Sequence, residues 1–75
     1  MKLKDLEQIK LSRSQWNFLI DEWIFKKHYR EIFKDKFLDG LTYGEIADKH
    51  KIEERNAQKI IQFCLKKLDK NIKRQ

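Results

Sequence analysis

Apolar residues recur along this 75-residue chain at the three- and four-residue spacing of amphipathic helices. The first clear segment opens with Ser12, and Gln15 completes a capping box, which predicts a helix that begins near Arg13. Its apolar residues cover one broad arc of an ideal helix: Trp16, Leu19, Ile20, Trp23 and Ile24. Phe18 and Phe25 lie on the opposite side. We expect the amino-terminal segment to cover these two side chains; the alternative is a patch that contacts a partner.

A second helix is predicted to begin near Lys27 and to end at Asp39 and Gly40, because glycine accepts the left-handed conformation that closes a helix. Its apolar residues are Tyr29, Ile32, Phe33 and Phe37. Residues 2–11 precede both helices and have apolar residues three apart, at Leu3, Leu6 and Ile9. This spacing indicates a short helix or a strap that lies over the rest of the chain.

Two further helices are predicted, with a short turn between them. Thr42 and Glu45 form a second capping box. The short helix that follows has one face made of Tyr43, Ile46, Ala47 and His50. The pattern stops at Ile52 and resumes in a longer helix at about residues 54–68, whose stripe is Ala57, Ile60, Ile61, Cys64, Leu65 and Leu68.

The composition agrees with an all-α fold. The chain has no proline and two glycines, which argues against a turn-rich β-sandwich. Its length suits one domain with a small core, and we predict a single domain at 1–75. The expected architecture is a small bundle of about four helices, with the amino-terminal helices at about 13–39.

Basic and amide side chains gather on the outward face of the last predicted helix. The candidate nucleic-acid contacts are Arg55, Asn56, Gln58, Lys59, Gln62 and Lys66. Arginine and glutamine can make bidentate contacts to guanine and adenine, and lysines neutralise phosphates. Phe63 flanks this face and joins Phe18 and Phe25 as a candidate protein contact. The alternative interpretation is a solvated face without a ligand.

The net charge of +6 is unevenly placed. Residues 1–50 contain 10 Lys or Arg and 9 Asp or Glu, whereas residues 51–75 contain 8 and 3. A basic carboxy-terminal part is typical of a protein that binds phosphates, although a high lysine content also serves solubility alone.

Several classes of function are not expected. The single cysteine, Cys64, cannot form an internal disulfide, and we interpret it as a small core residue. The two histidines are far apart in the sequence, which gives no cluster for a structural zinc, and no metal, cofactor or enzymatic activity is predicted. No segment has the apolar length of a membrane span or of a signal peptide, so we expect a cytoplasmic protein without a membrane partner.

Residues 33–68, "FKDKFLDGLTYGEIADKHKIEERNAQKIIQFCLKKL", resemble the carboxy-terminal helix-turn-helix of sigma factors, called region 4, and small sigma-like proteins of phages. The residues in register are Gly40, Leu41, Thr42, Tyr43, Glu45, Ile46, Ala47, Ile52, Ala57, Ile60, Leu65 and Leu68. The resemblance covers about half of the chain and implies a helix-turn-helix at about 42–68. Two positions depart from the family pattern, which has glycine at Lys51 and a Ser or Thr cap at Glu53.

The resemblance implies a DNA-binding transcriptional regulator whose recognition helix, about 54–68, lies in the major groove of double-stranded DNA. RNA polymerase, another protein or a second copy of the chain are the candidate partners of the amino-terminal helices. The alternative is a small phage-type protein-binding module, either a polymerase adaptor or an inhibitor of a host or defence protein. Glu53 and Glu54 favour this alternative because carboxylates at the start of a recognition helix repel phosphates.

Overall fold

The computed structural model describes residues 3–73, and within that range it contains five α-helices and no strand. The helices are α1 (Leu3–Glu7), α2 (Arg13–Trp23), α3 (Lys27–Phe37), α4 (Tyr43–His50) and α5 (Glu54–Lys73). The prediction of an all-α fold is confirmed. There are five helices in place of about four because the amino-terminal segment forms α1.

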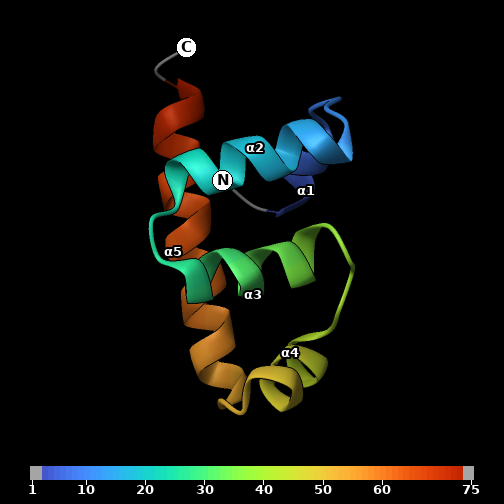
Figure 1. Cartoon of the computed structure of the whole chain (residues 1–75), viewed down its shortest axis with the longest axis vertical. Coiled ribbons are helices and arrows are strands. Elements are labelled where there is room, and N and C mark those ends of the chain that lie inside the picture. Colours follow the sequence, from blue (N-terminus) through green and yellow to red (C-terminus); the bar gives the residue numbers. More distant parts are fainter. Residues whose placement is uncertain (1–2, 74–75) are drawn as a thin grey trace.

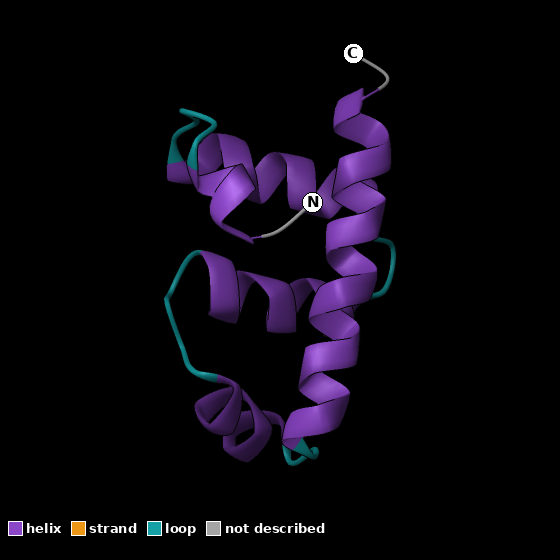
Figure 2. Ribbon diagram, turned by 180° about the vertical axis from the view of Figure 1, so that it is seen from behind, coloured by secondary structure: helices purple, strands orange, loops and turns teal. Residues whose placement is uncertain are grey.

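Helix α5 is the element on which the others assemble. Helices α2, α3 and α4 each contact it, and they follow one another along its length (Figures 1 and 2). Twenty residues make a helix of about 30 Å, which nearly equals the longest extent of the chain, 35 Å. No helix formed by residues 3–73, α5 included, combines the length and apolar character needed to cross a membrane.

Helix α5 continues beyond Leu68, where the sequence pattern predicted its end. No glycine or proline follows that position to stop the helix. Ile72, one turn later, packs against the core and extends the apolar stripe. The predicted boundary was therefore about five residues too early.

Both predicted capping boxes are present. The Gln15 backbone N–H donates to Ser12 Oγ at 3.1 Å, and the Ser12 N–H donates to Gln15 Oε1 at 2.8 Å. At α4, the corresponding bonds between Thr42 and Glu45 are 3.1 and 2.9 Å long. These bonds fix the starts of α2 and α4 at the predicted residues.

The hydrophobic core combines residues of all five helices. Its buried members are Leu6, Trp16, Ile20, Ile24, Ile32, Phe33, Ile46, Ala57, Ile61, Cys64, Leu65 and Leu68. Ile60 belongs to the same stripe but is only partly buried. Trp16 meets Phe37 edge to face, with ring centroids 4.9 Å apart, and joins α2 to α3. The core therefore holds the outer helices in fixed positions along α5.

The amino-terminal segment does not cover the two outward phenylalanines, and that prediction is wrong. Helix α1 buries Leu6 completely, while Leu3 and Ile9 also pack against the core. These apolar residues of the amino-terminal segment therefore pack against the core and not against the two phenylalanines. Phe18 and Phe25 remain 64% and 85% exposed.

Candidate nucleic-acid interface

The six residues predicted to contact nucleic acid are all exposed on α5. They are Arg55, Asn56, Gln58, Lys59, Gln62 and Lys66. The opposite side of the helix is buried, since Ala57, Ile61, Cys64 and Leu65 are at most 3% exposed. The apolar stripe is thus used by the core, and its polar counterpart is available to a ligand.

Five of the six residues share one continuous surface. Six side chains of α5 surround a shallow open depression: Arg55, Gln58, Lys59, Gln62, Phe63 and Lys66. We call this row of outward-facing side chains the α5 ridge. Asn56 is exposed but does not line the depression. The ridge combines three cations, two amides and one aromatic side chain.

The turn before α5 is tightly closed. Lys51 adopts the left-handed conformation, with φ 55° and ψ 48°, at the position where the family pattern has glycine. The Ile52 N–H donates to the Ala47 carbonyl at 3.0 Å, as in a Schellman closure. Only residues 51–53 separate α4 from α5, so the first turn of α5 is held directly against the end of α4.

One of the two carboxylates at the start of α5 turns toward α4. Glu54 Oε1 would lie 3.1 Å from a Cβ atom added to Gly44, so its side chain rests over the first turn of α4. Glu53 is exposed. The repulsion expected between Glu54 and a phosphate backbone is reduced by this orientation.

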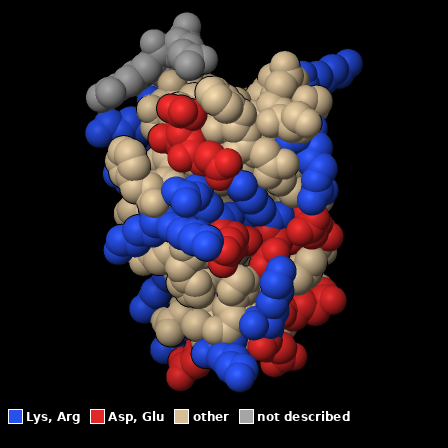
Figure 3. Space-filling view, viewed as in Figure 1, with Lys and Arg blue, Asp and Glu red and all other residues tan. Residues whose placement is uncertain are grey.

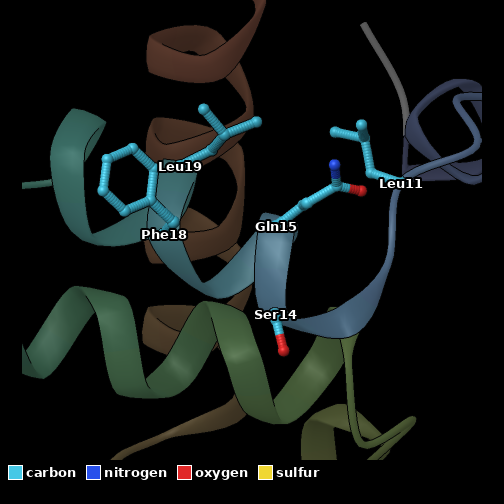
Figure 4. Close-up of a pocket in the computed structure, with 5 residues that line it drawn as sticks. All are labelled: Leu11, Ser14, Gln15, Phe18 and Leu19. Atoms are coloured by element: carbon cyan, nitrogen blue, oxygen red, sulfur yellow. The ribbon is translucent and has the colours of Figure 1, made fainter.

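The three candidate protein contacts do not form a single patch. Phe25 and Phe63 line the same small pocket, together with Trp23, Ile24, Lys26 and Lys67. Phe63 is 42% exposed and meets Tyr29 edge to face at 5.3 Å. Phe18 belongs to a different apolar depression, shared with Leu11, Ser14, Gln15 and Leu19 at the start of α2 (Figure 4).

Phe25 lies in the corner between α2 and α3, at residues 24–26, and hydrogen bonds hold the backbone of this corner. Arg30 Nη1 donates to the carbonyls of Ile24 and Phe25 at 3.0 and 2.8 Å. Asp21 lies 3.6 Å from Arg30 Nε and accepts a 2.7 Å bond from Lys34 Nζ. Phe25 is therefore an exposed aromatic residue on a fixed backbone.

Figure 3 shows that charges of both signs alternate on the face that α2 and α3 present in that view. The ion pairs of Asp21 with Arg30 and Lys34 belong to these helices. Because neighbouring charges of opposite sign offset one another, this arrangement gives no extended basic field on this face of α2 and α3.

No match emerges from comparisons of this chain with protein-family models, curated proteins and solved structures. The resemblance to sigma region 4 therefore rests on the residues quoted above.

The main polar feature that the sequence did not predict is a buried carboxylate. Asp35 is 4% exposed and accepts hydrogen bonds from Lys49 Nζ at 2.9 Å and from His50 Nε2 at 2.7 Å. Burial raises the pKa of Asp35, but the bonds and charges of Lys49 and His50 outweigh it and lower the pKa overall. The hydrogen-bond partner of His50 is therefore a side-chain carboxylate of α3.

The two histidines, far apart in sequence, are neighbours in space. The His28 and His50 rings meet edge to face with centroids 5.4 Å apart. Candidate ligand atoms of His28, Glu31 and His50 all lie within 4.8 Å of one another. The expectation that the histidines form no cluster is therefore wrong. The spacing of His28 and Glu31, three residues apart on a helix, was a visible signal, but the approach of His50 depends on how α4 packs against α3.

Proposed function

We propose that this chain is a DNA-binding transcriptional regulator of the sigma region 4-like helix-turn-helix type. Helices α4 and α5 with the turn at residues 51–53 form the motif, and the first part of α5, about residues 54–68, enters the major groove. Arg55, Gln58 and Gln62 read base edges, while Lys59 and Lys66 contact phosphates.

The observation that supports this proposal most directly is the α5 ridge itself. Its cations and amides lie on one continuous surface, whereas the apolar residues on the other side of α5 pack in the core. Long polar side chains on a rigid helix match the depth of the major groove. The turn of Glu54 toward Gly44 reduces the repulsion between this carboxylate and a phosphate backbone.

The proposal predicts that ridge substitutions weaken binding to DNA. Duplexes selected from a random pool by the intact protein provide the ligand, and fluorescence anisotropy measures its affinity. Arg55→Ala and Gln62→Ala should each cost about 1–3 kcal/mol if their side chains contact bases, and they should relax the sequence preference at one position. Lys59→Ala should weaken binding about equally on all sequences.

Lys10→Ala is the matched control for the lysine substitution. Lys10 is exposed and lies outside α5, and its removal changes the net charge by the same amount as Lys59→Ala. Failure to select any duplex, or equal affinities for the ridge variants and the control, would contradict the proposal.

A second candidate is a protein-binding module, favoured by the 85% exposure of Phe25 on its fixed corner. Exposed aromatic residues on ordered backbone are common at protein interfaces. An RNA polymerase adaptor or an inhibitor of another protein would use this surface. Loss of RNA polymerase binding in a Phe25→Ser variant, with DNA affinity unchanged, would support this candidate over the first.

A further inference from the structure

The cluster of His28, Glu31 and His50 lies outside the α5 ridge and joins two helices. His28 and Glu31 are one turn apart near the start of α3, so they project from the same side of that helix. His50 is the last residue of α4. The packing of α3 against α4 brings the three side chains together, with candidate ligand atoms no more than 4.8 Å apart.

We propose that these three side chains bind a divalent transition-metal ion of the zinc class. Two imidazoles and one carboxylate form a ligand set that zinc uses in proteins, and imidazole also suits nickel and copper. Metal–nitrogen bonds of about 2.0–2.1 Å place tetrahedral ligand atoms about 3.3 Å apart. Ligand atoms up to 4.8 Å apart therefore need to approach one another by at most about 1.5 Å, a movement that side-chain rotations supply.

The bond between His50 and Asp35 supports the assignment independently of the cluster. Metal-binding histidines usually donate their second ring N–H to a carboxylate, which orients the ring and makes the ligand nitrogen more basic. His50 Nε2 lies 2.7 Å from Asp35 Oδ2, and both side chains are at most 9% exposed. This bond leaves His50 Nδ1 as the nitrogen that would bind the ion.

The remaining neighbours are compatible with a bound cation. Three cations line the groove that contains Glu31 and His50, and each is paired with a carboxylate: Lys49 with Asp35, Arg13 with Asp39, and Lys34 with Asp21. Glu31 and His50 line an open groove together with Asp35 and Lys49, so water can complete the coordination shell. His28 and Glu31 are exposed, and the ion can therefore enter from solvent.

Metal binding is tested with the intact, tag-free protein, since a histidine tag would itself bind the ion. Calorimetric titration with Zn²⁺ should give one equivalent, and Co²⁺ should produce the visible absorption of a low-symmetry site. His28→Ala and Glu31→Gln should each lower the affinity by about 100-fold or more, because loss of an outer partner alone costs 10–100-fold. Both positions are exposed, so neither substitution threatens the fold.

Glu22→Gln is the control, because it removes an exposed carboxylate from α2 without touching the cluster. It should bind the ion as the unchanged protein does. Nitrogen-15 spectra of the imidazoles should show His50 binding through Nδ1 while Nε2 stays protonated. Absence of saturable binding, or binding that survives both His28→Ala and Glu31→Gln, would overturn the proposal. Neither result depends on whether the protein binds DNA.

Discussion

At the scale of single residues, Lys51 has a left-handed backbone conformation that lysine does not favour. A left-handed backbone costs a side-chain-bearing residue about 1–2 kcal/mol relative to glycine, and Lys51 has a φ of 55°. Lys51→Gly should therefore stabilise the protein by about 0.5–1 kcal/mol, after allowance for the greater freedom of glycine in the unfolded chain. Urea unfolding measures the change.

The comparison variant is Lys51→Val, because a β-branched residue tolerates this conformation least. It should be less stable than the unchanged protein. If both variants had the same midpoint of unfolding, the strain at this turn would not contribute to stability.

Cys64 is predicted to be chemically inert in the native protein. Burial raises the pKa of its thiol from 9.0 to about 12, and Sγ lies 3.8 Å from the Tyr29 carbonyl. The reactive thiolate is therefore scarce at pH 8 to 9. Iodoacetamide labelling followed by mass spectrometry should be slow until denaturant is added. Rapid labelling of the folded chain would contradict the buried position.

The raised pKa of Cys64 also predicts that the stability of the protein falls as the pH rises above 9. Because the pKa of Cys64 is raised, the folded state holds the thiol proton more tightly than the unfolded state. This contribution to the free energy of unfolding is fully present below pH 9. It is lost as the pH rises from 9 toward 12, because the unfolded thiol ionises first.

At the scale of elements, α4 contains a glycine that its helix does not require. Gly44 has no positive φ, and an added Cβ would lie 3.1 Å from the end of the flexible Glu54 side chain and in ordinary contact with Thr42 Oγ1 at 3.9 Å. Gly44→Ala should stabilise the protein by about 0.5–1 kcal/mol through helix propensity, with Glu54 moving by a few tenths of an ångström.

Thermal unfolding followed by circular dichroism measures this effect. Gly40→Ala is the contrasting variant, since Gly40 has a φ of +71° and alanine is strained there. Gly40→Ala should lower the midpoint while Gly44→Ala raises it. Two changes of the same sign would contradict the assignment of these glycines to different roles.

Local sequence signals were sufficient to predict most helix boundaries. The starts of α2 and α4 follow from their capping boxes. The end of α3 was predicted at Asp39 and Gly40, but the helix ends at Phe37, and Gly40 has its positive φ in the turn that follows. The end of α5 was missed because Ile72 continues the stripe by one turn, a weak signal without a stop residue. Signals that act within a few residues are visible in one sequence.

Features that depend on contacts between helices could not be predicted. The exposure of Phe18 and Phe25 depends on where α1 packs, and the burial of Asp35 depends on the position of α4. The outward face of α5 was predictable because its opposite stripe is strongly apolar. The proximity of His28 to His50 was not, since the two residues are 22 positions apart in the sequence.

At the scale of the whole molecule, the excess of positive charge predicts how DNA binding responds to salt. Each phosphate neutralised by a cation contributes about −0.9 to the slope of log affinity against log salt concentration. Two cations of the α5 ridge, Lys59 and Lys66, are proposed to contact phosphates. Anisotropy titrations over several salt concentrations should therefore give a slope of about −1.8 or steeper. A slope near zero would show that phosphates are not the partners of this surface.

Phe63 borders both the α5 ridge and the pocket that contains Phe25. Two different ligands that each cover this ring would compete for the same area. Nucleic acid on one side and a protein on the other would then exclude one another, with no change in the shape of the chain. One shared side chain, Phe63, would thus be enough to make the binding of the two partners mutually exclusive.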